Sequence, residues 1–148
     1  MKLFSSALSL LSIIAVATAA TCPPVASTPE EQLASFNAFV QKFYYDKNVK
    51  AAFMDHVDVN YIQHNPNALS GRQTAIDTLS PVIGQFKITL LNKGFVDNRG
   101  WVHYRMDIGG SQPQAILDLF RFNGSCIMEH WDVAQARPTN PKNPLAMW

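Results

Sequence analysis

An aspartate stands in the middle of an apolar stretch, Asp118 in LDLFRF. If this stretch is a β-strand, Asp118 shares one face with Ile116, Phe120 and Phe122. A carboxylate in such company either faces solvent or lies in an apolar cavity, where a raised pKa lets it accept and return protons. We expect the cavity, with Asp118 as general acid and base and Phe120 as part of a substrate-binding wall.

Asp118 also has a structural alternative, which is a salt bridge to Arg72 or Arg105. In that case the carboxylate would hold the fold together and would not move protons. Arg72 is in addition a candidate for substrate binding.

Two histidines are candidates to assist Asp118 in catalysis. His103 lies in the alternating segment WVHYRM, where a neutral imidazole could donate to an enolate oxygen or orient the carboxylate. His64 lies in YIQHNP, where the proline restricts the preceding residue, and loop positions often carry function. Tyr61 of the same segment could add a hydroxyl donor at the cavity mouth. Both histidines have structural alternatives, as a bonded core or edge residue and as a partner for loop backbone groups.

The segment EHWDVAQ holds a second group of polar residues. If it is a strand, Glu129 and Trp131 share one face, and His130 and Asp132 share the other. Alternation does not decide which pair faces the cavity. We favour Trp131 as a cavity wall and Glu129 as a second carboxylate.

Other kinds of catalytic site have less support in the sequence. The four histidines lack the short spacings of zinc sites, so we predict no metal ligand and no cofactor. A di-histidine site assembled by the fold is the alternative. The pattern G-x-S-x-G of serine hydrolases is absent.

Two features concern processing of the chain. Cys22 and Cys126 could form a disulfide in an oxidising compartment, and two free thiols are the alternative. Asn123 begins the sequon Asn123-Gly124-Ser125 at an expected hairpin tip, which makes it a glycosylation candidate.

The composition indicates one globular domain of 148 residues with net charge +1 and 47% hydrophobic residues. A charge so balanced argues against a nucleic acid or an anionic membrane as an electrostatic partner. Residues 1–20 read as a signal peptide, because Lys2 precedes an apolar run and Ala17-Thr18-Ala19 offers small residues for cleavage. A retained membrane anchor is the alternative. We expect secretion, a tail over residues 21–29 and a domain over residues 30–148.

The pattern predicts helices first and strands afterwards. Thr28 reads as the N-cap of a first helix with Pro29 at its first position. Residues 57–67 read as an irregular segment, and residues 136–148 as an extended strap whose apolar end docks on the domain. Helices are expected over 29–44, 49–56 and 71–83, and strands over 86–96, 101–108, 114–122 and 126–135. This order indicates an α+β domain, with three helices packed on a curved antiparallel sheet around a conical cavity.

Several motifs together, YIQHNP, Gly71-Arg72, LDLFRF, the NGS turn and EHWDVAQ, resemble the SnoaL-like polyketide cyclase family. The likeness is greatest to its aldol-condensing type, within the nuclear transport factor two-like superfamily of cone-shaped α+β domains. The resemblance implies an aspartate that acts as acid and base, a histidine on the preceding strand, and no metal or cofactor. By position, Asp118 and His103 match those two residues.

The sequence therefore supports two hypotheses about function. The first is an enzyme that transfers protons next to a carbonyl of a small apolar substrate, by aldol condensation, isomerisation or dehydration. The second is a non-catalytic domain that binds a small hydrophobic ligand or dimerises through the open face of its sheet. Leu117, Leu119 and Arg121, on the face opposite Asp118, would suit packing against a second copy.

Overall fold

The computed structural model describes residues 22–145 and 147–148, so the expected signal peptide lies outside the described residues. Helix α1 (Pro29–Val40) continues into a π-helical turn, Gln41–Tyr45. Helix α2 (Val49–His56) and helix α3 (Arg72–Leu79) follow, and a short 3-10 turn at Ile83–Gln85 leads into the sheet. The third helix is therefore shorter than the sequence predicted.

Five strands form one sheet in the order β1-β5-β4-β3-β2. Their bounds are β1 Val57–Gln63, β2 Phe86–Val96, β3 Arg99–Ile108, β4 Gln114–Asn123 and β5 Cys126–Ala136. Strands β2 to β5 pair antiparallel as predicted, whereas β1 joins the edge parallel to β5. The prediction of an irregular segment over 57–67 was wrong for Val57–Gln63. These residues form a strand because they pair with β5, and the local residue pattern does not indicate this hydrogen-bond ladder.

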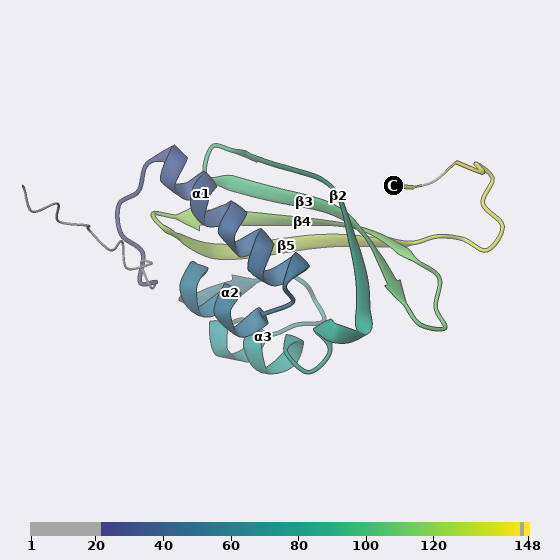
Figure 1. The fold of residues 1–148 in the computed structure, drawn as a ribbon, viewed down its shortest axis with the longest axis horizontal. Helices are drawn as coiled ribbons and strands as arrows, with labels where there is room; N and C mark the ends of the chain where they lie inside the picture. The colour runs from purple at the N-terminus through teal and green to yellow at the C-terminus, as the bar shows by residue number, and fades with distance from the viewer. Residues whose placement is uncertain (1–21, 146) are drawn as a thin grey trace, which may run out of the picture.

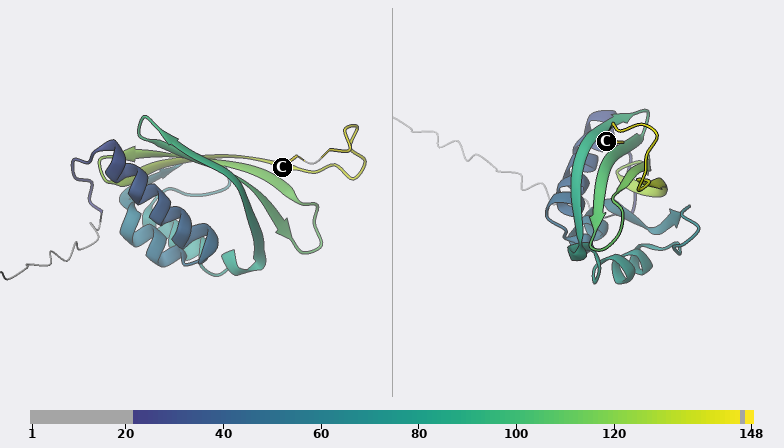
Figure 2. Two further views of the ribbon diagram at one scale, coloured as in Figure 1. Left: turned by 45° about the horizontal axis from the view of Figure 1, so that its top comes forward. Right: turned by 90° about the vertical axis from the view of Figure 1, so that its right-hand side faces the viewer.

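The three helices cover one face of the curved sheet and leave the other face open (Figures 1 and 2). We call these the inner and the outer face. This arrangement confirms the predicted α+β fold. The core between the layers is largely aromatic, since Phe36 and Phe39 of α1 pack against Phe120 of β4.

The start of α1 follows from local hydrogen bonds. The Thr28 hydroxyl accepts from the Glu31 backbone N–H at 3.3 Å, and the Glu31 carboxylate accepts from the Thr28 N–H at 2.8 Å. This reciprocal capping satisfies two of the backbone donors that a helix leaves free at its start. The predicted N-cap is therefore confirmed.

The N-terminal tail is fixed to the tip of the β4–β5 hairpin. Cys22 and Cys126 form a disulfide with their Cα atoms 5.8 Å apart. The Val25 carbonyl accepts from the Ser125 N–H at 2.9 Å, and the approach is so close that a side chain at Gly124 would collide with Val25. The neighbouring Asn123 is exposed, as a glycosylation site requires, and its modification stays a prediction.

The C-terminal segment ends on the outer face. The guanidinium of Arg105, on β3, lies 4.4 Å from the ring centroid of Trp148, within the range of a cation–π contact. Trp148, the last residue of the expected strap, therefore docks on the sheet, whereas Leu145 of the same apolar end is 72% exposed.

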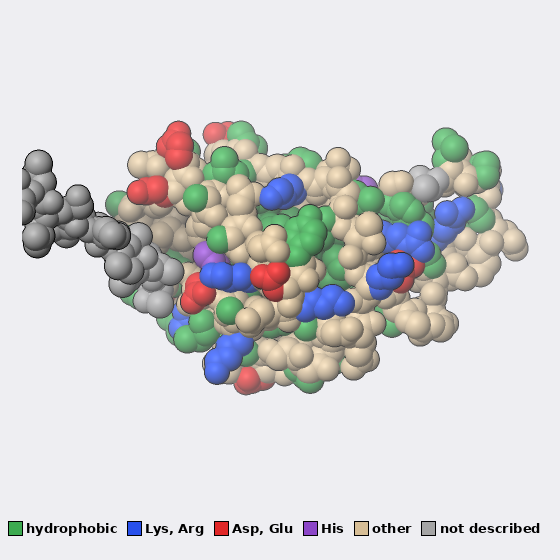
Figure 3. All heavy atoms as spheres, in the orientation of Figure 1, with side chains coloured by type: hydrophobic (Ala, Val, Ile, Leu, Met, Phe, Trp, Pro, Cys, Tyr) green, Lys and Arg blue, Asp and Glu red, His purple; other side chains and the backbone are tan. Residues whose placement is uncertain are grey.

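Acidic and basic side chains lie near one another over the face drawn in Figure 3, in line with the small net charge. Within the described residues, no helix combines the length and the apolar character needed to cross a membrane.

Candidate active site

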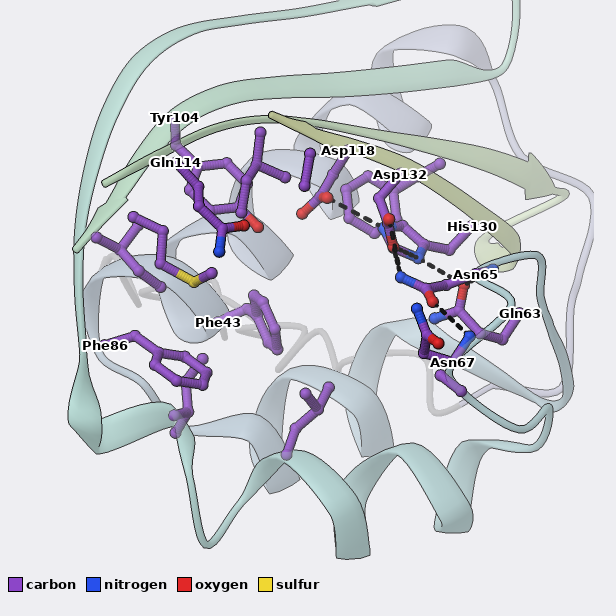
Figure 4. A pocket seen from close by; sticks show the side chains of 18 of the residues that line it. Phe43, Gln63, Asn65, Asn67, Phe86, Tyr104, Gln114, Asp118, His130 and Asp132 are labelled. Carbon is purple, nitrogen blue, oxygen red and sulfur yellow. Dashed lines mark hydrogen bonds and ion pairs between the residues drawn. The ribbon is translucent and has the colours of Figure 1, made fainter. Parts of the chain in front are cut away.

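A cavity of about 400 Å³ lies between the helices and the inner face of the sheet (Figure 4). Most of its wall is apolar, and most of the polar groups gather on one side, where β4, β5, the end of β1 and the segment after it meet, whereas Gln114 lies apart beside Tyr104 (Figure 4). Apolar lining residues include Phe43, Phe53, Ile83, Phe86, Ile88 and Met106. Among the residues that the structure describes, no lysine or arginine lines the cavity. Two acidic residues, Asp118 and Asp132, line it.

Asp118 lies at this polar side and is 5% exposed. The Tyr44 hydroxyl, at the end of the first helical segment, donates to Asp118 Oδ2. The structural alternative does not hold, because Arg105 bonds Asp107 at 2.9 Å and Arg72 donates to the Val57 carbonyl at 3.1 Å. The carboxylate thus faces the cavity without an arginine partner.

His130, on β5, lies beside Asp118 and is 8% exposed. Its Nε2 is 3.4 Å from Asp118 Oδ1, and its Nδ1 is 3.0 Å from Gln63 Oε1. The imidazole is therefore held between a carboxylate and an amide. A group that can both donate and accept a proton stands next to a buried carboxylate.

Asp132 lies two residues further along β5 and faces the same cavity. Both of its oxygens accept from Asn65 Nδ2, at 2.8 and 2.9 Å. Asn65 Oδ1 in turn accepts from the Asn67 backbone N–H at 2.8 Å, which fixes the orientation of the amide. Asp132 is therefore held as a hydrogen-bond acceptor.

Three tyrosines surround Asp118 and stay protonated over a wide pH range. Burial, together with the Asp118 charge, raises the pKa of Tyr44, Tyr61 and Tyr104 well above the usual 10. Tyr61 and Tyr104 line the cavity, and Tyr61 accepts a hydrogen bond from Gln63 Nε2 at 3.1 Å. Both hydroxyls remain neutral and can donate to a developing negative charge on a bound molecule.

The residues at the polar side can carry out acid–base chemistry. A carboxylate, an imidazole and neutral phenols meet in a cavity whose remaining wall is largely apolar. Such a set can remove a proton from a bound molecule, stabilise the negative oxygen that results, and return a proton elsewhere.

Comparison with known proteins identifies the fold. A scan against protein-family models gives no match, and a search of curated proteins gives none either. Among solved structures, a proposed ketosteroid isomerase from Kribbella flavida superposes with a TM-score of 0.65 at 9% identity, covering 79% of this chain and 87% of its own. An NTF-2 like protein of unknown function from Burkholderia xenovorans gives 0.64 at 16% identity, with 76% and 89% covered.

A proposed polyketide cyclase from Acidithiobacillus ferrooxidans gives a TM-score of 0.56 at 10% identity, with 70% of this chain and 87% of the other covered. The chain has the NTF2-like fold. At identities of 9 to 16%, these likenesses establish the fold and do not establish an activity.

The NTF2-like sheet places His103 on the outer face, so the expectation that it assists Asp118 does not fit the geometry. His103 lies opposite Leu117 in the β3–β4 ladder, and Val102 lies opposite Asp118. Opposed residues of antiparallel strands share a face, so His103 and Asp118 point to opposite sides of the sheet.

The expectation for Glu129, Trp131 and His64 was also wrong about their position. All three lie on the outer side, where His64 stacks on Trp131 with ring centroids 4.3 Å apart. Glu129 accepts from Arg121 and lies 3.2 Å from His64 Nε2. None of the three is among the residues that line the cavity.

A β-bulge in β5 explains the position of Glu129 and Trp131. Near the turn Phe122 pairs with Ile127, but the next pair is Arg121 with Glu129, so Met128 is an extra residue. One extra residue reverses which side chains face which side of the sheet. Without the bulge, Asp118 would lie opposite Trp131; with it, Asp118 lies opposite Asp132.

Arg72 does not reach the cavity and holds backbone instead. Its guanidinium donates to the Val57 carbonyl at 3.1 Å and to the Cys22 carbonyl at 3.5 Å. Of the residues proposed for substrate binding, Tyr61 and Phe120 line the cavity.

The sequence did not identify Gln63, His130 and Asp132 as site residues. It assigned Asn65 only a structural role, as a hydrogen-bond partner for backbone groups of a loop. A signal for two of them was present: Tyr61, Gln63 and Asn65 recur at two-residue spacing, as inward residues of a strand do. For His130 and Asp132, alternation separated the two faces of the strand, but no local pattern indicated the bulge that decides which face lines the cavity.

The carboxylates of Asp118 and Asp132 and the imidazole of His130 offer ligand atoms within 4.8 Å of one another. They are the residues of the described chain best placed to hold a cation. Each already has a protein partner, since Asn65 bonds Asp132, Gln63 bonds His130 and Tyr44 bonds Asp118. We therefore assign no metal to the cluster.

Proposed function

We propose that this protein is an acid–base catalyst that moves a proton next to the carbonyl group of a small, apolar, uncharged substrate. The reaction classes are aldol condensation, isomerisation and dehydration. The observation that carries the proposal is the buried Asp118–His130 pair at the wall of an apolar cavity. Groups of the chain itself supply every role that the reaction needs.

In the proposed reaction the Asp118 carboxylate removes a proton from the carbon next to the carbonyl. The electron pair of the broken C–H bond forms an enolate, and Tyr104, which faces the cavity, donates to its oxygen. His130 in its protonated form returns a proton to another carbon in an isomerisation, or to a departing hydroxyl in a dehydration. In an aldol condensation, the enolate carbon attacks a second carbonyl and the new alkoxide takes the proton.

The charge of the lining residues defines the substrate class. Two carboxylates and no lysine or arginine line the cavity. Carboxylate or phosphate substrates would meet like charge in a poorly solvated space, which is unfavourable. A neutral ketone or hydroxyketone meets polar groups at its oxygen and an aromatic wall along its carbon skeleton.

The comparisons are consistent with this proposal at the level of fold. Two of the superposed structures are proposed enzymes, an isomerase of ketosteroids and a polyketide cyclase. The same fold can serve unrelated chemistries, so the argument depends on the site.

Hydrogen exchange next to a carbonyl tests the proposal without a known substrate. The protein is incubated in D₂O with a panel of small apolar ketones, and deuterium uptake at the α-carbon is followed by NMR. We expect catalysed exchange for at least one ketone and its loss in Asp118→Asn. Asp107→Asn, a carboxylate on the outer side of β3, is the matched control and should keep the activity. Uncatalysed exchange for every ketone that binds would contradict the proposal.

A binding domain without catalysis is the second candidate function. Every buried side-chain nitrogen and oxygen of the described residues has a hydrogen-bond partner, so the site is also complete as a static lining. A carrier would retain a hydrophobic ligand in native mass spectrometry and show no exchange. The two measurements together separate carrier from enzyme.

We also propose that two copies associate through the outer face. Leu117 and Val133 are 41% and 67% exposed there, beside an open groove that also includes His103 and Gln135. Light scattering should give the mass of a dimer, and Val133→Lys should reduce it to the mass of a monomer. A monomer for the unmodified protein would contradict the association.

The Cys22–Cys126 disulfide supports the proposal that the protein is exported, because such bonds persist in oxidising compartments. Expression in a secreting host should yield a product that starts near Ala20 or Thr21. An unprocessed N-terminus in the medium would contradict cleavage.

A further inference from the structure

The hydrogen bonds around His130 determine which of its nitrogens carries a proton. The starting point is the Asn65 backbone N–H, which donates to the side chain of Gln63 at 3.0 Å. A backbone N–H can only donate, so the Gln63 atom that faces it is the carbonyl oxygen, Oε1. The amide nitrogen then faces Tyr61, as observed at 3.1 Å.

The same Gln63 oxygen faces His130 Nδ1 at 3.0 Å. Because Oε1 can only accept, Nδ1 must carry a hydrogen in both the neutral and the charged imidazole. The second nitrogen, Nε2, therefore bears a proton only when the ring is charged. This nitrogen is the one that faces Asp118 Oδ1, at 3.4 Å.

The other oxygen of Asp118 already has a donor. The Tyr44 hydroxyl donates to Oδ2, and burial raises the pKa of Tyr44 far above neutrality, so the phenol keeps its proton. The carbonyl oxygen of a carboxyl group is the better acceptor, so a proton on Asp118 is favoured on Oδ1, opposite His130 Nε2, while Oδ2 accepts from Tyr44. If both Oδ1 and Nε2 carried a proton, two hydrogens would point at each other. If neither carried one, two lone pairs would point at each other.

We propose that Asp118 and His130 hold one shared proton between Oδ1 and Nε2, and that Gln63 is the positioning residue that fixes this arrangement. The pair exists as carboxylate and imidazolium or as carboxylic acid and neutral imidazole. In the first form it has one base and one acid at the same wall of the cavity (Figure 4). The use of the pair in catalysis rests on the proposed function, whereas the position of the protons does not.

The shared proton has a consequence for the reaction. When the Asp118 carboxylate accepts a proton from the substrate carbon, the His130 imidazolium can give up its Nε2 proton to the substrate. One proton has then entered the pair and one has left it, so the pair again holds one. The chain needs no proton from solvent within a turnover, which suits a cavity with an apolar wall.

Nitrogen-15 NMR of the histidine rings tests the arrangement directly on the full mature chain without a substrate. We expect the His130 signal to show a protonated Nδ1 at every pH at which the protein is folded. A ring with a hydrogen on Nε2 and a bare Nδ1 would overturn the proposal. His130→Gln assigns the signal by its disappearance.

Two variants of Gln63 show whether this residue imposes the proton position. Gln63→Leu removes the acceptor 3.0 Å from Nδ1 and leaves only Asp132 Oδ2 at 3.9 Å, so the neutral ring should carry its hydrogen more often on Nε2, with a shift of the tautomer ratio of roughly tenfold. Gln63→Glu keeps an acceptor and should keep Nδ1 protonated. Gln114→Leu, which changes a cavity glutamine on another strand, is the matched control and should leave the His130 signal in its original form.

The outcomes separate this inference from the proposed function. An unchanged tautomer in folded Gln63→Leu would overturn the role of Gln63, whatever the activity of the protein. If Gln63→Leu does not fold, the unmodified protein and Gln63→Glu still decide the question. A protonated Nδ1 together with no carbonyl-dependent exchange would leave the assigned position of the Nδ1 hydrogen in place and reject the catalytic proposal.

Discussion

The two faces of strands β4 and β5 hold similar residue types in different surroundings. On the inner face, Asp118 and His130 lie in an apolar cavity that no lysine or arginine of the described chain lines. On the outer face, Glu129 is bonded by Arg121 and then by His64, and these contacts lower the pKa of Glu129. An ionised carboxylate that is paired with a guanidinium on a solvated face has little tendency to accept a proton at neutral pH. The comparison shows that surroundings, and not residue type, distinguish the candidate site.

The largest expected effect separates the two strand histidines. His130→Gln should reduce carbonyl-dependent hydrogen exchange by about 10²- to 10⁴-fold, the usual contribution of a general acid or base. His103→Gln, on the outer face, should change it by less than about twofold. Initial rates of deuterium uptake at equal ketone concentration measure both. Equal losses in the two variants would remove the distinction between the faces.

The second effect concerns the three buried tyrosines on the inner side. The raised pKa values of Tyr44, Tyr61 and Tyr104 mean that the unfolded chain releases these protons near pH 10 while the folded chain keeps them. Their contribution to stability is present below pH 10 and is lost as pH rises, at about 1.4 kcal/mol per group and pH unit.

Urea unfolding at a series of alkaline pH values measures this loss of stability. Near-ultraviolet absorbance should show that the three tyrosines ionise together with unfolding. Their ionisation in the folded protein near pH 10 would contradict the burial of the inner side.

His56 tests whether burial alone, without a neighbouring Asp118, could give a histidine the properties proposed for His130 on the inner face. His56 is as buried as His130, at 8% exposed, but its neighbours are Ser35 and Lys42. Burial, aided by the Lys42 charge, lowers the pKa of His56 from 6.5 to about 4. Between pH 6.5 and 4, His56 therefore binds a proton in the unfolded chain and stays neutral in the folded chain.

Stability from His56 is fully present above pH 6.5 and falls between pH 6.5 and 4. The loss is at most about 3 kcal/mol, and solvent near Lys42 and Asp55 reduces it. Urea unfolding of the protein and of His56→Gln across this range isolates the contribution. Identical pH slopes would show that His56 is not held neutral.

The smallest effect compares one glycine on each face. An added Cβ at Gly100 would lie 2.5 Å from the Phe36 ring, which is buried in the core; at Gly94 it would lie 2.6 Å from Trp101, which is partly exposed. Gly100→Ala should cost about 1–3 kcal/mol, because the core cannot yield, and Gly94→Ala less than about 1 kcal/mol, because the indole can move. Denaturant midpoints measure both, and the reverse order would contradict the packing of α1 on the sheet.

Local patterns were sufficient to predict much of this fold. The Thr28 cap gave the start of α1, alternation placed Asp118 on the same face as Phe120, and Asn123-Gly124 indicated the β4–β5 hairpin. Each of these features depends on residues a few positions apart. The Cys22–Cys126 pair was one of two open alternatives, because a disulfide depends on distance in space.

Features that depend on pairing between distant segments could not be predicted in this way. Strand β1 exists because β5 lies beside it, and Met128 reverses the later part of β5 through a bulge with no marker in EHWD. His103 matched the resembled family by position, but only the β3–β4 register shows which way it points. The sequence therefore predicted the acid of the site and missed its histidine.

The most direct test of the account compares one carboxylate from each face in the same assay. Hydrogen exchange at the α-carbon of a bound neutral ketone is measured for the unmodified protein, Asp118→Asn and Glu129→Gln. The account predicts loss of catalysed exchange in Asp118→Asn and an unchanged rate in Glu129→Gln. Full exchange by Asp118→Asn, with ketone binding intact, would contradict the assignment of proton transfer to the inner face.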